Sequence, residues 1–256
     1  MRITLVRHAQ STWNAEARWQ GQSDVPLSTV GREEAACVGV RLGDERFDRI
    51  VASDLSRAMD TARAIAGERV VESNAALREM NLGSWCGLPH IEVASKHAEE
   101  LRALSRGEDV RIGGTGETIV EFSERVLGAL GAIEGGPHES VLVVTHGGVI
   151  RAVLMALLNL AGRERPLIGS GNTGITRLRF EDQRRTLAVY NDQAHLSLGH
   201  EEGDRIVHGV GAASALDAAL TLTSPPIEPL KDDACAVLHV PEGKPAQLRR
   251  YGVVRS

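Results

Sequence analysis

The fold is decided by two stretches of sequence, MRITLVRHAQ at residues 1–10 and VLVVTHGG at residues 141–148. In each stretch a short apolar run rich in Val, Ile and Leu leads into a histidine. A run that is apolar throughout is typical of a strand buried on both faces of a parallel sheet. The two stretches therefore predict buried strands over Ile3–Val6 and Val141–Thr145.

Helical and strand patterns alternate between and after these two strands. Ser28 predicts the N-cap of a helix that runs to about Leu42, and Leu55–Ala66 predicts a second helix that ends at Gly67. The remaining predictions are strands at Arg49–Ser53, Val70–Val71, Gly174–Phe180 and Thr186–Tyr190, and helices at Pro89–Arg106, Thr118–Ile133 and Gly147–Leu160. This order predicts an α/β fold in which a mostly parallel central sheet is covered on both faces, a three-layer α/β/α sandwich.

The length of 256 residues allows a domain of about 200 residues with an appendage. The alternating pattern continues to about His195 and then degrades. We therefore predict a domain over residues 1–196 and a C-terminal extension of unknown role over residues 197–256. Within the extension the sequence indicates a weak helix over Ala212–Leu222 and a hairpin around residues 241–245.

Composition excludes several classes of protein. A net charge of −5 does not fit a generally basic surface, so no nucleic-acid partner is expected. The longest apolar stretch, residues 149–160, is too short to span a bilayer, and the N-terminal residues show no apolar signal-peptide segment. Three widely spaced cysteines, Cys37, Cys86 and Cys235, fit a reducing compartment. We therefore expect a cytoplasmic protein with no membrane partner.

Charged and imidazole side chains follow three of the predicted strands. Arg7 and His8 come directly after the first strand, and His146 follows the strand over Val141–Thr145. Arg57 lies near the start of the helix that follows Arg49–Ser53. Ligands bind beyond the carboxyl ends of strands in open α/β sheets, so these side chains converge if the three strands are neighbours.

Such a cluster suits phosphoryl transfer. Guanidinium groups match phosphate oxygens, a neutral histidine nitrogen is a competent nucleophile, and the backbone N–H of Gly147 at a helix start can face an anion. A departing alkoxide also needs a proton, which a carboxylic acid can supply. Glu79, in the irregular segment Leu77–Trp85, is a candidate, although spacing alone does not select it from thirty-four acidic residues.

An ordered set of motifs resembles the histidine phosphatase superfamily, which includes the cofactor-dependent phosphoglycerate mutases. The set comprises LVRHAQSTWN at residues 5–14, Gln20–Gly21, Pro26–Ser28, Ser53–Ala58, Leu77–Glu79, Gly116–Thr118, Thr145–Gly148, Asn191–Asp192 and His195–Leu196. Each piece alone is a weak signal, but the order and spacing together are specific. The resemblance covers roughly residues 1–196 and implies a phosphoglycerate mutase-like fold.

The resemblance also implies a role for each matching side chain. His8 is then the nucleophile that is transiently phosphorylated, and Glu79 is the proton donor and later the base. The phosphate-binding set is Arg7, Arg57, His146, Asn14, Gln20, Gly21 and Gly147. No metal and no cofactor are implied.

Two positions depart from the family pattern: Ala9 replaces a usual glycine, and Cys86 replaces a frequent glutamate beside Trp85.

Residues 80–87, MNLGSWCG, resemble the phosphatase branch and lack the tyrosine-containing segment of the mutases. We therefore expect a phosphoric monoester hydrolase that acts on a small phosphorylated substrate. Mutase-type phosphoryl transfer and non-catalytic binding of a phosphate ligand are alternatives. The chain could also form a homodimer through the tail or a sheet edge.

Overall fold

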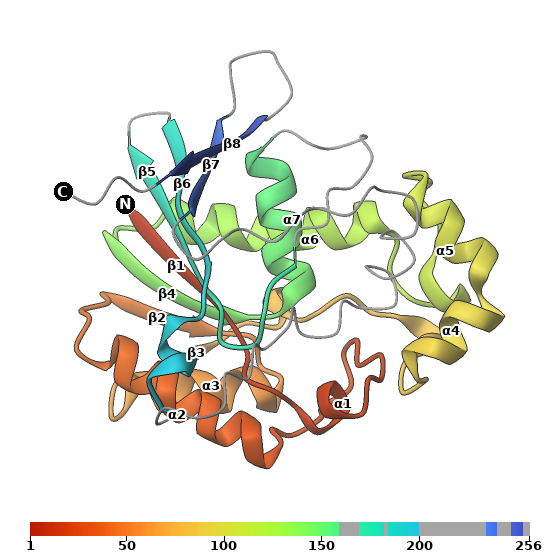
Figure 1. The fold of residues 1–256 in the computed structure, drawn as a ribbon, viewed down its shortest axis with the longest axis horizontal. Coiled ribbons are helices and arrows are strands. Elements are labelled where there is room, and N and C mark those ends of the chain that lie inside the picture. Colours follow the sequence, from red (N-terminus) through yellow and green to blue (C-terminus); the bar gives the residue numbers. More distant parts are fainter. Residues whose placement is uncertain (159–168, 182–183, 200–233, 240–246, 253–256) are drawn as a thin grey trace.

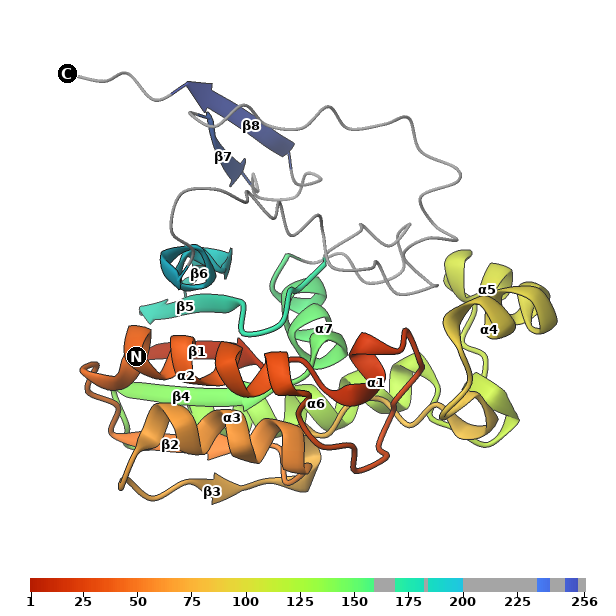
Figure 2. The ribbon, with the colours of Figure 1, turned by 60° about the horizontal axis from the view of Figure 1, so that its bottom comes forward.

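A central sheet of six strands organises the protein. The computed structural model describes residues 1–158, 169–181, 184–199, 234–239 and 247–252. The strands are β1 (Arg2–Arg7), β2 (Arg49–Ala52), β3 (Glu72–Ser73), β4 (Ser140–Thr145), β5 (Ile175–Glu181) and β6 (Arg184–Asp192), in the order β3-β2-β4-β1-β5-β6. The first four in this order are parallel, and the β5–β6 hairpin joins β1 antiparallel (Figure 2). The predicted mostly parallel sheet is therefore present, with an antiparallel edge.

Helices cover both faces of this sheet. On one face lie α2 (Thr29–Gly43) and α3 (Ser56–Ala66), and on the other lie α6 (Ile119–Glu134) and α7 (Gly147–Leu157) (Figure 1). Strand β4 alternates between the two cores, because Val141 and Val143 pack with α6 and α7 while Leu142 and Val144 pack with α2 and α3. Burial on both faces explains why the strand is apolar at every position. The predicted three-layer sandwich is confirmed.

Local capping fixes the helix ends that the sequence predicts. The Ser28 hydroxyl accepts a hydrogen bond from Gly31 N at 2.9 Å at the start of α2. Thr118 and Glu121 form a reciprocal capping box at the start of α6. Helix α3 ends at Gly67, whose φ of 60° lies in a region that glycine reaches without strain.

Three short helices lie beyond the end of the sheet toward which β1 points: α1 (Thr12–Ala15), α4 (His90–Lys96) and α5 (Ala98–Ser105) (Figure 2). The prediction of one polar helix over residues 89–106 is wrong, because His97 leaves helical geometry with φ −120° and ψ 29°. The break lets both short helices bury apolar residues on one cluster around Trp85, to which they contribute Val93, Leu101 and Leu104.

Other boundaries differ by a few residues. Strand β3 occupies residues 72–73 rather than the predicted Val70–Val71, because Val70 is 81% exposed and only the later pair reaches the edge of β2. Short 3-10 turns are also present at Ala75–Leu77 (η1), Gly83–Trp85 (η2), Ile112–Gly114 (η3) and Ala194–Gly199 (η4).

The C-terminal extension contains a hairpin where one was predicted. Strands β7 (Ala234–His239) and β8 (Gln247–Gly252) pair antiparallel on either side of residues 240–246. The helix predicted over residues 212–222 lies outside the described residues. No helix in the described part of the chain is both long and apolar enough to cross a membrane.

Candidate active site

The parallel pairing of β1 with β4 brings the two predicted histidines together. Arg7 lies opposite Thr145 in the register, so His8 and His146 follow adjacent strand ends. The backbone N–H of His8 donates to the carbonyl of Thr145 at 2.8 Å. The two imidazole rings lie 5.1 Å apart between centroids and are almost fully buried. The convergence predicted from the strand pattern is therefore real for this pair.

One hydrogen bond decides which nitrogen of His8 is reactive. Nδ1 of His8 lies 2.7 Å from the carbonyl oxygen of Ala9, which can only accept, so Nδ1 carries the proton and Nε2 keeps its lone pair. Ala9 is held in turn by a 3.0 Å bond from its N–H to the Thr61 hydroxyl. Its methyl group packs with Leu27 and Ala35, so alanine in place of the family's glycine fills the core and leaves the orienting carbonyl in position.

Arg57 is a fully buried cation held by backbone carbonyls. Its Nη1 donates to the carbonyl of Ser23 at 2.7 Å and its Nη2 to the carbonyl of Gly21 at 2.8 Å. Its Nε has no hydrogen-bond partner among the described residues. Burial lowers the pKa of Arg57 to about 10, against an opposing effect of the Glu79 charge. The guanidinium remains charged at neutral pH and retains capacity to bind an anion.

Arg7 is held by a backbone carbonyl. Its Nη1 donates to the carbonyl of Ser170, and its guanidinium lies beside Gly147, where an added Cβ would be in ordinary van der Waals contact, 3.5 Å from Nε. The same loop reaches the nucleophile, because Nδ2 of Asn172 donates to the carbonyl of His8 at 2.9 Å. Sequence reasoning missed Ser170 and Asn172. Their position depends on the non-glycine residue Thr173 adopting a φ of 55°, which no local pattern indicates.

His146 has one engaged and one open ring nitrogen. Nε2 lies 2.9 Å from the Ser53 hydroxyl, and Nδ1 has no partner among the described residues. Burial, followed by the charge of Arg57, holds the pKa of both His146 and His8 well below the ordinary value of 6.5. The Arg7 charge acts in the same direction on both rings. Both imidazoles are therefore neutral at physiological pH.

The carboxylate of Glu79 is fixed by backbone amides. Oε1 accepts from the N–H of Met80 at 2.9 Å, and Oε2 accepts from the N–H of Gly148 at 3.0 Å in the first turn of α7. The partial positive charge of a helix N-terminus favours a carboxylate there. This contact links the Glu79 segment to the helix that follows His146. Glu79 is thus joined to the same helix start that contacts Arg7.

The side chains of Asn14 and Gln20 both contact Ser11, and Oδ1 of Asn14 also accepts from Nδ2 of Asn172 at 3.5 Å. Oδ1 of Asn14 accepts from the Ser11 backbone N–H at 3.1 Å in the capping box of α1, and Oε1 of Gln20 accepts from the Ser11 hydroxyl at 2.7 Å. The amide nitrogen of Asn14 makes no hydrogen bond to the described residues, so it retains two donors. Direct roles of these two residues in phosphate binding stay predictions.

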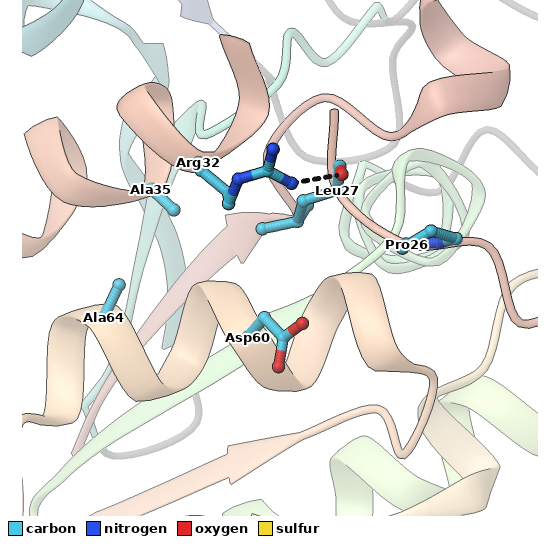
Figure 3. A pocket seen from close by; sticks show the side chains of 6 residues that line it. All are labelled: Pro26, Leu27, Arg32, Ala35, Asp60 and Ala64. Atoms are coloured by element: carbon cyan, nitrogen blue, oxygen red, sulfur yellow. Dashed lines mark hydrogen bonds between the residues drawn. The ribbon is translucent and has the colours of Figure 1, made fainter. Parts of the chain in front are cut away.

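A hollow elsewhere on the surface is separate from this cluster. It has a volume of about 260 Å³, lies between α2 and α3, and is lined by Pro26, Leu27, Arg32, Ala35, Asp60 and Ala64 (Figure 3). Arg32 closes one side by donating from Nη1 to the carbonyl of Leu27 at 3.0 Å (Figure 3). No predicted site residue lines the hollow. Within the described residues, no group of three or more His, Cys, Asp or Glu side chains could hold a metal ion.

Comparison with known proteins identifies the family. The sequence profile of the histidine phosphatase superfamily (branch 1) matches residues 3–193. The chain belongs to this superfamily. A metal-independent phosphoserine phosphatase from Arabidopsis thaliana is 37% identical over 202 residues, which cover 76% of this chain and 83% of that protein. The glucosyl-3-phosphoglycerate phosphatase from Mycobacterium tuberculosis is 36% identical over 217 residues, which cover 77% of this chain and 96% of that protein.

Solved structures give the same family assignment. The complex of a mycobacterial glucosyl-3-phosphoglycerate phosphatase with inorganic phosphate matches with a TM-score of 0.66 and 32% identity, covering 76% of this chain and 98% of that one. The predicted family and fold class are confirmed. The predicted enzyme class, a phosphoric monoester hydrolase, agrees with the phosphatases to which the chain is similar.

Proposed function

We propose that this protein hydrolyses small phosphomonoesters through a phosphohistidine formed on His8. One observation carries the proposal: the hydrogen bond from Nδ1 of His8 to the Ala9 carbonyl leaves Nε2 unprotonated in a buried site near two arginines. A low pKa keeps this nitrogen nucleophilic at physiological pH. The motif set of the superfamily supports the same role for His8.

In the first step Nε2 of His8 attacks phosphorus while the bond from phosphorus to the ester oxygen breaks. Arg7 and Arg57 bind the phosphoryl oxygens and stabilise the charge of the transition state. Nδ1 of His146 donates a further hydrogen bond, since its Nε2 can accept from the Ser53 hydroxyl. The carboxylic acid of Glu79 gives its proton to the departing alkoxide.

In the second step the Glu79 carboxylate takes a proton from water, and the resulting hydroxide attacks phosphorus. The phosphorus–nitrogen bond breaks, which restores His8 and releases inorganic phosphate. The amides of Met80 and Gly148 hold the carboxyl group in one place for both proton transfers. No step of this sequence uses a metal ion.

We propose a small anionic metabolite of the phosphoserine or phosphoglycerate type as substrate. The proposal is supported by the relatives, named as a phosphoserine phosphatase and a glucosyl-3-phosphoglycerate phosphatase. We also propose a cytoplasmic location, which the free thiols of Cys37 and Cys86 support. Residues 1–196 are proposed as the catalytic domain, and the homodimer stays a prediction.

The test is phosphate release from a panel of esters by purified protein with a chelator present, beside the His8→Ala variant. Release that is lost in the variant supports a metal-independent histidine phosphatase and ranks its substrates. Interconversion of phosphoglycerates only after a bisphosphoglycerate is added would instead establish a mutase. Full activity of His8→Ala would rule out the covalent mechanism.

A further inference from the structure

We propose that Arg125, paired with Glu117, is the positioning residue of the proton donor Glu79. The inference rests on the proposed function, because it assigns a role toward Glu79 as acid. Arg125 lies in α6, and neither it nor its partner is among the residues that follow the sheet strands. Its contacts converge on the segment that carries Glu79.

All five N–H groups of the Arg125 guanidinium are used inside the protein. Nε and one Nη2 hydrogen are directed at the two carboxylate oxygens of Glu117, at 2.7 and 2.8 Å. The remaining donors reach three carbonyls: Ala76 at 3.0 Å, Arg78 at 3.0 Å and Glu79 at 3.2 Å. A guanidinium has five donors, so Arg125 has none left for a substrate. Its role is therefore structural support aimed at one loop.

The Glu79 segment needs such support because regular structure does not hold it. Residues 78–81 lie between the 3-10 turns η1 and η2, and their carbonyls have no backbone hydrogen-bond partner within a helix or strand among the described residues. The Leu77 carbonyl accepts from the Thr145 hydroxyl at 2.8 Å, and the next two carbonyls accept from Arg125. Gln22 adds a second donor to the Glu79 carbonyl at 3.1 Å. Side-chain donors thus take the place of the backbone hydrogen bonds that a helix or strand would supply.

Glu117 extends the support to the other side of Glu79. Its Oε2 accepts from the N–H of Asn81 at 2.8 Å, and its own N–H donates to the Asn81 carbonyl at 2.8 Å. The ion pair therefore holds the backbone two residues after Glu79 as well as the carbonyls at and before it. Lysine cannot reproduce this, because an ammonium has three donors and no planar fork.

The experiment compares Arg125→Lys, Arg125→Gln and Glu117→Gln on two substrates that differ in their need for acid. An alkyl ester such as phosphoserine has a poor leaving group, whereas nitrophenyl phosphate has a good one. We expect kcat/KM for the alkyl ester to fall roughly 10- to 100-fold and that for nitrophenyl phosphate less than about threefold. For the alkyl ester, the part of the pH–rate profile that depends on the proton donor should become weaker in the same variants. Thermal melting confirms that each variant is folded.

Arg111→Gln is the matched control. Arg111 also makes a two-pronged pair, with Glu121 at 2.6 and 2.9 Å, and also donates to a backbone carbonyl, that of Gly116 at 2.7 Å. It does not contact residues 76–81. Its removal should leave the ratio of the two activities unchanged.

A double variant separates failure of this inference from failure of the proposed function. If Arg125 acts through the acid, Arg125→Gln should cost little further activity once Glu79→Gln is present. The decisive quantity is the ratio of kcat/KM for the alkyl ester to kcat/KM for nitrophenyl phosphate. If this ratio is unchanged in Arg125→Lys, Arg125→Gln and Glu117→Gln but changed in Glu79→Gln, the inference alone is overturned. An unchanged ratio in Glu79→Gln itself overturns the acid role, and with it the inference.

Discussion

Replacing Gly148 by alanine should separate catalysis from stability. A Cβ built on Gly148 would stand 2.1 Å from Oε1 of Glu79 and 3.0 Å from its Cδ. The Glu79 carboxyl is the end of a side chain, so it can move aside at little cost to the fold. Its hydrogen bond from the Gly148 N–H, 3.0 Å long, would be distorted or lost.

The size of the effect follows from that contact. A carbon and an oxygen need at least about 3.2 Å, so the carboxyl must move by roughly 1 Å, and a misplacement of this size can cost about 100-fold in rate. We expect kcat/KM for an alkyl phosphate to fall about 10- to 100-fold, with a smaller loss for nitrophenyl phosphate. Alanine is favoured over glycine in helices by up to about 1 kcal/mol, which offsets part of the loss of the Gly148 hydrogen bond, so the melting temperature should change little.

The assay is steady-state hydrolysis of both esters together with thermal melting. Gly128→Ala in α6 is the control, because nothing lies within 4 Å of the position of its added Cβ. The control should gain stability and keep its activity on both esters. Full activity of Gly148→Ala on the alkyl ester, or an equal loss on both esters, would refute the placement of Glu79 as the acid.

Three further perturbations test the rest of the site. Arg57→Lys should lower kcat/KM by about 100-fold or more, because an ammonium cannot hold the carbonyls of Ser23 and Gly21 and still bind phosphate; kinetics and urea unfolding measure the two costs. His8→Ala should abolish acid-labile labelling by a phosphorus-labelled substrate, while Arg111→Gln should label normally. The pKa of His8 and His146 is lower in the folded protein than in the unfolded chain, so below pH 6.5 the unfolded chain binds more protons. The free energy of unfolding should therefore fall as the pH falls. His8→Gln should lower that slope by up to about 1.4 kcal/mol per pH unit in urea titrations between roughly pH 5 and pH 6.5.

The sequence predicts those site residues that directly follow the ends of strands. His8 and His146 follow apolar runs that predict buried parallel strands, so the sequence predicts that they converge if those strands are neighbours, and the pairing of β1 with β4 supplies that condition. Glu79 could be named only from the family resemblance, because its segment is irregular and its position depends on Arg125, some forty-six positions away. Hydrogen bonds of that sequence separation leave no local signal.

The same limit explains why α4 and α5 were predicted as one helix. The stretch over residues 89–106 has helical composition throughout, and only the packing of Val93 and Leu101 on one cluster requires the break at His97. Tertiary contacts override a local propensity of a few tenths of a kcal/mol per residue, by the ~1.5–3 kcal/mol that a buried apolar side chain contributes.

The electrostatics of the site favour a dianion. Arg57 is fully buried, and no carboxylate of the described residues lies within ion-pair distance of it, so its charge lacks a direct counter-ion. The neutral histidines add no negative charge. A phosphate dianion supplies it, and the strongest opposing charge already acting on Arg57 is that of Glu79. In the proposed mechanism Arg57 therefore binds the dianion together with Arg7. Glu79 gives its proton to the departing alkoxide, and the carboxylate left behind is the base that the second step requires.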